Sequence, residues 1–296
     1  MSQMTEQFLD YLRLERNYSP KTVEVYRKDL LLFEEFFTVL EGHPTWETVD
    51  ADIIRDWMGS MMDKGNTASS INRRLSAVRS FYRFALKHGL VDSDPAHQVT
   101  GPKKKKVLPV FIPETLMKKL LDEYEWKDNY HDVLARTLLI ILYETGMRRS
   151  EVTGLDKDDA DMLNRQFKVT GKRDKQRLIP FGARLAETLE RYMEKRRELP
   201  ADNSTALLVS SKGNRLDPEQ VYNIVKTSLG LVTTQKKRSP HVLRHTFATS
   251  MLNHDAGLES VQKLLGHESL KTTEVYTHTT FEQLKRVYEL AHPRKE

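Results

Sequence analysis

Residues 241–249 read HVLRHTFAT and gather three polar side chains within little more than one helical turn. His241, Arg244 and His245 stand at positions i, i+3 and i+4, so a helix would present all three on one face. Arginine offers phosphate oxygens a planar fork of donors, and histidine exchanges a proton near neutral pH. The stretch therefore predicts a helix, expected over residues 240–253, with a face suited to an anion.

The same histidines suggest a competing zinc site, with His267 as a third ligand. Metalloproteases that use two histidines four residues apart have glutamate after the first, and here that position is Val242. Arg244 would also repel a cation from the centre of the face. We therefore expect an anion site with no metal and no other cofactor.

Four further segments supply side chains that suit the same anion, and they contain Arg148, Lys172, His267 and Tyr276. Taken singly, each has a simpler explanation. Arg148 suits a salt bridge, Lys172 an exposed turn, His267 a helix end and Tyr276 packing. Their shared function depends on whether the fold brings them together.

Several common sites are excluded by composition and spacing. The chain has no cysteine, which excludes disulfides, cysteine-ligated metals and a thiolate nucleophile. Gly171-Lys172 does not end a P-loop, because Gln166 stands where the first glycine is needed. The acidic run 156–161 lacks the central glycine and distal glutamate of an EF-hand, so it predicts an exposed turn.

Length and composition indicate a globular protein of two domains. The chain has 296 residues, of which 39% are hydrophobic and 30% charged. Its longest apolar run, Leu138–Leu142, is far too short to span a bilayer. The first cation is Arg13, so the N-terminus lacks the basic region of a signal peptide. We expect a cytoplasmic protein without membrane insertion.

The net charge of +5 is unevenly distributed, since residues 1–100 sum to −3 and residues 101–296 to +8. This asymmetry has two explanations. It is either ordinary surface variation or the mark of a polyanion gripped mainly by the C-terminal part.

Residues 1–100 predict a domain of four helices. Ser19-Pro20, Asp50 and Thr67 are helix-start signals for three of them. From Val23 to Leu40, apolar residues recur every three to four positions over five turns, as in a helix with one buried face. No strand pattern interrupts these residues, so the apolar stripes are expected to form the core of an all-helical domain.

Residues 101–110 form an expected linker, because Gly101-Pro102 precedes four lysines and another proline. This segment reads either as a solvated hinge or as a basic strap along phosphates. Residues 111–296 then predict a second, mainly helical domain with one small antiparallel sheet, formed by a hairpin over 165–181. Helices are expected near 113–122, 130–143, 183–198, 217–229, 240–253, 258–265 and 281–291.

Five motifs in a fixed order give a more specific signal than any one of them. They are TGMRRSE at 145–151, GK at 171–172, HVLRHTFAT at 241–249, LLGH at 264–267 and YTH at 276–278. In this order they resemble the tyrosine recombinase, or phage integrase, family, and most closely its Xer-type members. The resemblance covers nearly the whole chain, including YSPKT at 18–22 in a core-binding domain. Ser250 and the segment 253–257 are less usual for the family.

The resemblance implies that Tyr276 is the nucleophile that attacks a DNA phosphodiester and forms a 3′-phosphotyrosine. A phenol with an ordinary pKa near 10 needs a base and an electropositive setting to do so. His241 would exchange that proton, and Lys172 would protonate the departing 5′-oxygen.

The resemblance also implies that Arg148 and Arg244 clamp the non-bridging phosphate oxygens and stabilise the transition state. His267 would add a hydrogen bond to the phosphate. The covalent link retains the energy of the phosphodiester, so neither ATP nor a metal is required.

Double-stranded DNA carrying a recombination site is the implied partner, held by a C-shaped clamp of the two domains. Most of the basic contacts are expected to reach phosphates and to set register. The candidate DNA-binding residues are Arg73, Arg74, Arg79, Arg83, Lys103, Lys104, Lys105, Lys106, Arg173, Lys175, Arg177, Lys236, Lys237 and Arg238.

The C-terminal apolar stripe, from Phe281 to Ala291, packs either on its own domain or on a neighbouring subunit. The resemblance implies the second arrangement, in a cyclic tetramer on two duplexes, with a second recombinase and a septal DNA translocase as possible partners. Chromosome-dimer resolution at cell division is the expected role.

Alternatives stay open. An integrase or invertase of a mobile element would use the same chemistry, although the compact length and the lack of an additional N-terminal arm-binding domain favour the Xer type. A type IB topoisomerase would share the active site, and a DNA-binding protein without catalysis is a rival from another class.

Overall fold

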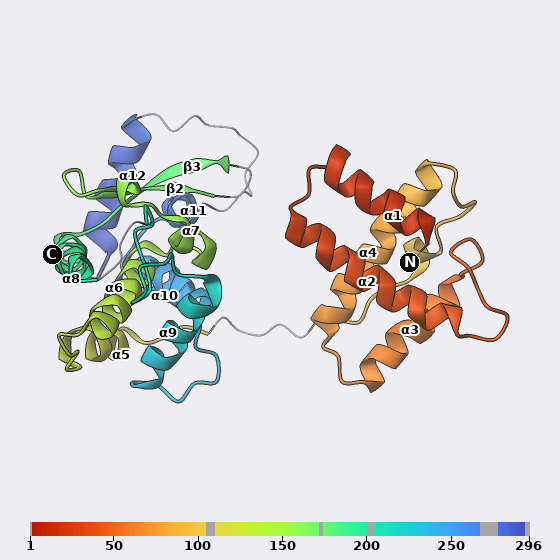
Figure 1. Cartoon of the computed structure of the whole chain (residues 1–296), viewed down its shortest axis with the longest axis horizontal. Helices are drawn as coiled ribbons and strands as arrows, with labels where there is room; N and C mark the ends of the chain where they lie inside the picture. The colour runs from red at the N-terminus through yellow and green to blue at the C-terminus, as the bar shows by residue number, and fades with distance from the viewer. Residues whose placement is uncertain (1, 105–109, 172–173, 200–203, 267–277, 294–296) are drawn as a thin grey trace. The chain divides into compact units, whose positions relative to one another are not determined.

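The computed structural model describes residues 2–104, 110–171, 174–199, 204–266 and 278–293, and the side chains of 278–283 are not among them. The chain divides into two compact units, Met1–Val107 and Leu108–Glu296. In Figure 1 the first is coloured red to yellow-orange and the second yellow to blue. The expected fold class is confirmed, since both units are mainly helical and one small antiparallel sheet lies in unit 2.

Unit 1 is built from helices that begin where the capping residues predict. Ser19 accepts a hydrogen bond from Thr22 N, Asp50 from Ile53 N, and Thr67 from Ser70 N. Such a cap contributes about 1 kcal/mol, since it satisfies an amide that the helix leaves unpaired. The elements are α1 (Gln3–Asp10), the π-helical turn η1 (Tyr11–Glu15), α2 (Pro20–Thr38), α3 (Ala51–Asp63), α4 (Ala68–Lys87) and η2 (Pro95–Gln98).

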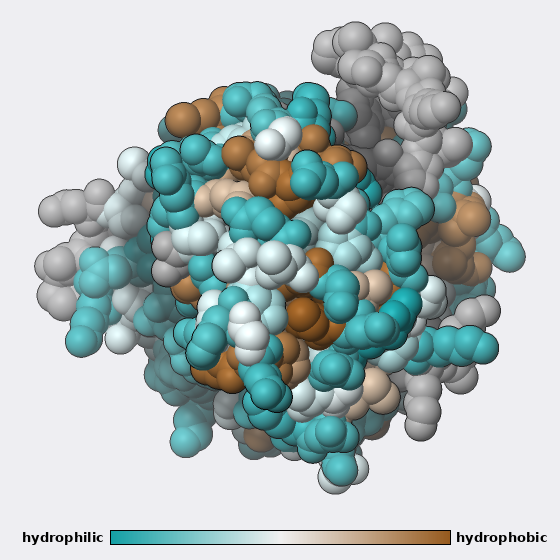
Figure 2. All heavy atoms as spheres, turned by 90° about the vertical axis from the view of Figure 1, so that its right-hand side faces the viewer, coloured by the Kyte–Doolittle hydropathy of each residue, from teal (hydrophilic) through white to brown (hydrophobic). Residues whose placement is uncertain are grey.

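An aromatic cluster forms the centre of unit 1. The ring centroids of Trp46 and Phe81 lie 4.1 Å apart, and those of Phe33 and Trp57 lie 4.6 Å apart. All four side chains are buried, and each contributes about 1.5–3 kcal/mol through the apolar surface it removes from water. Figure 2 faces unit 1 and shows hydrophobic residues there in patches separated by hydrophilic ones. The apolar residues that recur along α2, α3 and α4 are buried in this cluster, so these stripes form the core of unit 1 as expected.

Unit 2 is organised around α6 (Tyr130–Thr145), which is buried from Val133 to Thr145 except at Arg136. Its neighbours α8, α9 and α10 pack directly against it. Figure 1 shows α6 near the middle of the unit, with α10 beside it. The other helices are α5 (Glu114–Lys118), η3 (Lys119–Glu123), α7 (Arg149–Gly154), η4 (Lys157–Asp159), α8 (Ala183–Arg197), α9 (Pro218–Gly230), α10 (Pro240–Asn253), α11 (Leu258–Leu265) and α12 (His278–Ala291).

The sheet of unit 2 contains the predicted hairpin. Strand β2 (Gln166–Thr170) pairs antiparallel with β3 (Gln176–Pro180), in a register that sets Val169 opposite Arg177. A two-residue strand, β1 (Ala160–Asp161), adds to β2 and was not expected, because two residues show no alternation. The acidic run 156–161 forms η4 and β1.

Helix α12 packs on its own unit within the single chain. Leu284, Tyr288 and Ala291 are buried in a cluster with Phe247 of α10 and Leu264 of α11. Of the two arrangements considered for the C-terminal stripe, the single chain has the first; Phe281 belongs to the undescribed side chains. Among the described residues, no helix combines the length and apolar character needed to cross a membrane.

Candidate active site

A glycine turn between α6 and α7 places Arg148 at the start of α7. Gly146 ends α6 in the left-handed conformation, with φ of 60°. A Cβ atom at this position would lie 2.8 Å from Leu265 Cδ2 and would also meet the Phe247 ring. Only glycine therefore combines this backbone conformation with such close packing against α10 and α11. The turn directs the Gly146 carbonyl toward α10, where it accepts a hydrogen bond from Arg244 Nη1 at 2.7 Å.

Arg148 is held by α7 and by the end of α11. Its Nη1 donates to Glu151 Oε1 at 2.8 Å, and its Nη2 donates to the Gly266 carbonyl at 2.8 Å. Its backbone amide donates to Glu151 Oε2 at 2.7 Å. The side chain stays 40% exposed. Arg148 is thus fixed in direction and still accessible to a ligand.

Glu151 is a buried carboxylate that also receives Arg177 from strand β3. Arg177 Nη1 and Nη2 donate to Glu151 Oε1 and Oε2, both at 2.9 Å, in a bidentate pair. Burial raises the pKa of Glu151, but the hydrogen bonds and charge of Arg177, together with the two bonds from Arg148, outweigh it and hold the pKa below its usual value. Glu151 is therefore ionised at neutral pH.

Arg244 lies deeper than Arg148. Its two terminal nitrogens donate to backbone carbonyls, Nη1 to Gly146 and Nη2 to Leu265 at 2.6 Å. Burial, and then the positive charge of Arg148, lower the pKa of Arg244 to about 10, which leaves it charged at neutral pH. Carbonyl oxygens provide hydrogen bonds but no counter-charge.

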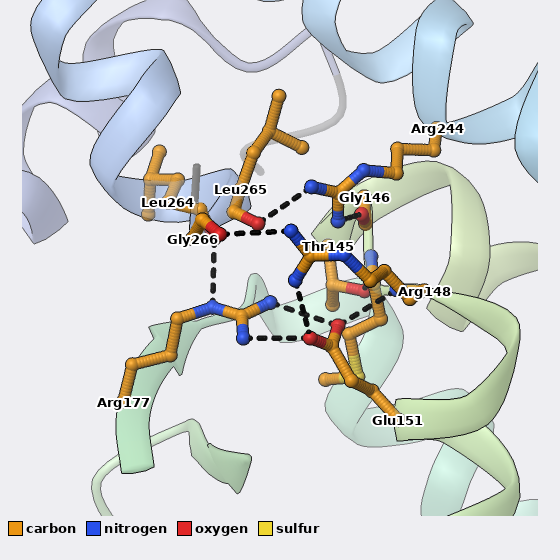
Figure 3. Close-up of polar contacts among 10 residues, drawn as sticks. Thr145, Gly146, Arg148, Glu151, Arg177, Arg244, Leu264, Leu265 and Gly266 are labelled. Atoms are coloured by element: carbon orange, nitrogen blue, oxygen red, sulfur yellow. Dashed lines mark hydrogen bonds and ion pairs between the residues drawn. The ribbon is translucent and has the colours of Figure 1, made fainter. Parts of the chain in front are cut away.

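These groups carry more positive than negative charge. Figure 3 shows the guanidinium groups of Arg148, Arg177 and Arg244 pointing toward one small region from the start of α7, from β3 and from α10. Glu151 is the only carboxylate drawn with them, so the four side chains sum to +2. Such a cluster favours an anion, and its buried members interact with that anion more strongly than exposed charges would.

Two histidines on α10 lie next to Arg244. Nε2 of His241 and Nε2 of His245 are 3.1 Å apart, so at least one of the two rings is neutral. Burial, then His241 and then Arg244, lower the pKa of His245. His241 is exposed, which fits a group that exchanges a proton with a ligand. Within the described ranges, no group of three His, Asp or Glu side chains is arranged to hold a metal.

Several predicted site residues lie outside the described residues: Lys105, Lys106, Lys172, Arg173, His267 and Tyr276. Their neighbours in the chain do reach the arginine cluster. Gly266 directly precedes His267, and its carbonyl accepts the hydrogen bond from Arg148. Gly171 directly precedes Lys172, and a Cβ atom on it would lie 3.6 Å from Glu151 Oε1.

The candidate DNA-binding residues fall into two groups. Those with exposed side chains are Arg73, Arg83, Lys103, Lys104, Lys175, Lys236 and Lys237. Of these, Arg73 also pairs with Asp29. The other described candidates are hydrogen-bonded within the protein. Arg79 donates to the carbonyls of Ala96 and Val99, Arg74 to Asn66, and Arg238 to the carbonyl of Thr233.

Arg177 lies apart from the exposed basic residues. The sequence places it in a basic hairpin and predicts a DNA contact, but the side chain is only 6% exposed and its donors serve Glu151 and the Leu264 carbonyl. Glu151 itself received no role from the sequence. Glu151 stands three residues after Arg148, which is the spacing of a capping box at a helix start. This spacing is the feature of the sequence that indicates a contact between the two residues.

Comparison with known proteins gives matches over both units. Residues 111–283 match the model described as "Phage integrase family", and residues 5–89 match "Phage integrase, N-terminal SAM-like domain". Tyrosine recombinase XerC of Chlorobaculum tepidum is 39% identical, with 97% of this chain and 94% of that protein covered. XerC of Pelotomaculum thermopropionicum is also 39% identical, with 98% and 97% covered.

Among solved structures, the XerH site-specific recombinase bound to a palindromic difH substrate has a similar fold. The TM-score is 0.72 at 23% identity, and the match covers 97% of this chain and 84% of that one.

Proposed function

The chain belongs to the phage integrase family of tyrosine recombinases, and on that premise we propose that Tyr276, Arg148, Arg244, His241, Lys172 and His267 carry its reaction. It is a Xer-type enzyme that breaks and rejoins DNA at specific sites. The observation that carries the site assignment is the cluster of Arg148, Arg177, Arg244 and Glu151, with two positive charges left for an anion. His241 lies on α10, the helix that also carries Arg244.

The proposed first step is an attack of the Tyr276 hydroxyl oxygen on the scissile phosphorus. The phenolic proton passes to His241, an O–P bond forms to tyrosine, and the bond to the 5′-oxygen breaks. Lys172 supplies a proton to that oxygen. The products are a 3′-phosphotyrosine and a free 5′-hydroxyl, and the reverse attack by a 5′-hydroxyl of another strand rejoins the DNA.

The roles of the two arginines follow from their surroundings. Arg148 is partly exposed and presents donors that Glu151 and Gly266 leave unused. Arg244 is buried and rigidly held by two carbonyls, so it adds charge without reorganisation. Together they suit the pentacoordinate phosphorane, which carries more negative charge on its oxygens than the diester does.

The test is covalent trapping on a nicked DNA site from which the cleaved end diffuses away. We expect the unaltered chain to form a protein–DNA adduct and Tyr276→Phe to form none. Tyr222→Phe, at a half-buried position of α9, is the matched control and should form the adduct normally. Adduct formation by Tyr276→Phe would refute the assignment of the nucleophile.

The proposed partner is a duplex DNA recombination site. Phosphate contacts are supplied by the exposed basic residues of both units. The sequence predicts the same role for Lys105, Lys106 and Arg173, which lie outside the described residues. Binding should therefore weaken steeply with salt, and each lost phosphate contact should reduce the slope of log K against log salt by about 0.9. An unchanged slope in Lys236→Ala would remove that residue from the set.

The proposed cellular role is resolution of chromosome dimers at cell division, in line with the XerC relatives. Mapping covalent adducts across the host genome should find one chromosomal site. Adducts at the ends of a mobile element would favour an integrase or invertase instead. Relaxation of supercoiled DNA without a specific site would favour a topoisomerase.

The proposed assembly is a tetramer on two duplexes, formed either by this chain alone or with a second recombinase, and activated by a septal DNA translocase. The apolar face of α12, with Leu284 and Tyr288, suits the same receptor surface on a neighbouring subunit. Light scattering on site DNA should give four recombinase chains per complex. A complex that never exceeds two chains on one duplex would contradict this assembly.

A further inference from the structure

We infer that Arg177 is a positioning residue for strand cleavage. Arg177 neutralises the charge of Glu151 and holds the end of α11 through a hydrogen bond. The positive charge of Arg148 then remains available to the phosphate. The inference rests on the proposed function of the same site. It assigns a role to a residue whose donors serve Glu151 and the Leu264 carbonyl.

Three elements of unit 2 meet on the Arg177 side chain. It extends from β3, forms the bidentate pair with Glu151 of α7, and donates from Nε to the Leu264 carbonyl of α11 at 3.0 Å. Figure 3 shows this bridge below Arg148 and Arg244. Each of these elements leads to a proposed catalytic residue, since β3 closes the hairpin of Lys172, α7 begins at Arg148, and His267 follows α11.

The backbone of α11 is shaped to admit this guanidinium. Gly266 has φ of 64°, and a Cβ atom on it would lie 3.2 Å from both Cζ and Nη1 of Arg177. A larger residue would therefore be strained and would press on the guanidinium. The same glycine supplies the carbonyl that orients Arg148. Arg177 and Arg148 thus lie against one turn from two directions.

The charges explain why Glu151 needs two arginines. Its carboxylate accepts two bonds from Arg177, one from the Arg148 side chain and one from the Arg148 amide. Without Arg177, Arg148 would be the only guanidinium bonded to this buried carboxylate. The four-residue cluster would fall from +2 to +1, and the remaining attraction would draw Arg148 toward Glu151 and away from a ligand. The loss should appear in the rate of cleavage rather than in DNA affinity.

The experiment compares Arg177→Met, Arg177→Lys, Glu151→Gln and the double variant Arg177→Met/Glu151→Gln with the unaltered chain. Arg197→Met, on the exposed end of α8, is the matched control. Two quantities are measured on nicked site DNA: the dissociation constant, and the single-turnover rate of adduct formation at saturating DNA. Native hydrogen-exchange protection of β3 and α7 is recorded for each variant.

For Arg177→Met we expect a cleavage rate lowered about 100-fold, with the dissociation constant changed less than about threefold. Arg177→Lys keeps the charge but not the fork, so its rate should be reduced only about tenfold. In the double variant the carboxylate charge is gone together with its partner. Its rate should exceed that of Arg177→Met at least tenfold, which a lost phosphate contact would not produce. The hydrogen-exchange protection of β3 and α7 separates this recovery of rate from a recovery of folding.

Two results would overturn the inference. One is weaker DNA binding by Arg177→Met, with a smaller salt slope and an unchanged rate for bound DNA, which would make Arg177 a phosphate contact. The other is a double variant no faster than Arg177→Met. If Arg177→Met loses protection in β3 and α7, Arg177→Lys takes its place in the test. A lowered cleavage rate with intact protection and unchanged DNA affinity supports the inference, and weaker binding with an unchanged rate for bound DNA overturns it. Absence of adduct with the unaltered chain would instead refute the proposed function.

Discussion

Each unit buries one carboxylate between two arginines, yet the two carboxylates behave in opposite ways. Asp29 of unit 1 contacts Arg73 and Arg74, and Glu151 of unit 2 contacts Arg148 and Arg177. Both carboxylates are 3% exposed. Burial raises the pKa of Asp29 above its usual value, despite the bond and charge of Arg73, whereas the pKa of Glu151 is lowered.

The difference lies in completed hydrogen bonds rather than in the number of nearby charges. Arg74 stays 3.8 Å from Asp29 and donates instead to Asn66, while Arg73 is 46% exposed and shares its charge with water. Glu151 accepts four bonds, two of them from a bidentate arginine. A buried carboxylate stays ionised where its oxygens are fully bonded, and charges in the vicinity alone do not achieve this.

The largest expected difference between the two clusters comes from removing each carboxylate charge in turn. Glu151→Gln leaves Arg177 buried without a counter-charge, so unit 2 should lose about 3 kcal/mol of stability. Asp29→Asn should change unit 1 by less than about 1 kcal/mol, since its arginine partner is half hydrated. Hydrogen exchange in the full chain, followed by peptides of each unit, measures both. Equal losses in the two units would remove the distinction.

The pH dependence of the two substitutions should have opposite signs. Glu151 has a lowered pKa in the folded state, so its contribution is present above the ordinary carboxyl pKa of about 4.3 and is lost as pH falls below it. The deficit of Glu151→Gln should therefore shrink between pH 5 and pH 3. Asp29 has a raised pKa, so its contribution is present below about 3.9 and is lost as pH rises.

Asp29→Asn should consequently gain stability relative to the unaltered chain as pH rises from 3 to 7. Unfolding followed by hydrogen exchange at several pH values tests both slopes. Slopes of the same sign would show that the two carboxylates do not differ in the way described.

The sequence predicts those parts of the molecule that depend on local rules. Ser19, Asp50 and Thr67 cap helices as expected, because a cap involves only residues next to it in the chain. The hairpin over 165–181 is also confirmed, because its two strands are neighbours in the chain. The π-helical turns η1 and η3 were not expected, since they interrupt helices without changing the apolar period.

The arginine cluster lies beyond local rules. Arg148 and Arg244 are 96 positions apart, so no local pattern predicts that they lie close together. In the sequence, only the resemblance to a known family places both at one phosphate. The sequence predicts Arg177 on the DNA-binding surface, because a charged residue in a hairpin is usually exposed. Its burial follows from the meeting of β3, α7 and α11, and no spacing along the chain encodes that meeting.

The smallest effect separates backbone strain from the arginine contact, and the two units supply a matched pair of glycines. Gly266 and Gly89 both have φ of 64°. A Cβ atom at Gly89 would meet nothing within 4 Å, whereas at Gly266 it would lie 3.2 Å from the Arg177 guanidinium. Gly89→Ala should therefore lose only the strain of the left-handed conformation, about 1 kcal/mol, and keep the cleavage rate.

Gly266→Ala should lose the same strain energy and, in addition, displace Arg177 and the carbonyl that holds Arg148. We expect its single-turnover cleavage rate to fall about tenfold, with DNA affinity unchanged. Denaturant unfolding and adduct formation, measured on both variants, separate the two contributions. Equal cleavage rates in Gly266→Ala and Gly89→Ala would mean that the close approach of Arg177 to this turn does not influence the reaction, and that the hydrogen bonds to Glu151 alone account for its role.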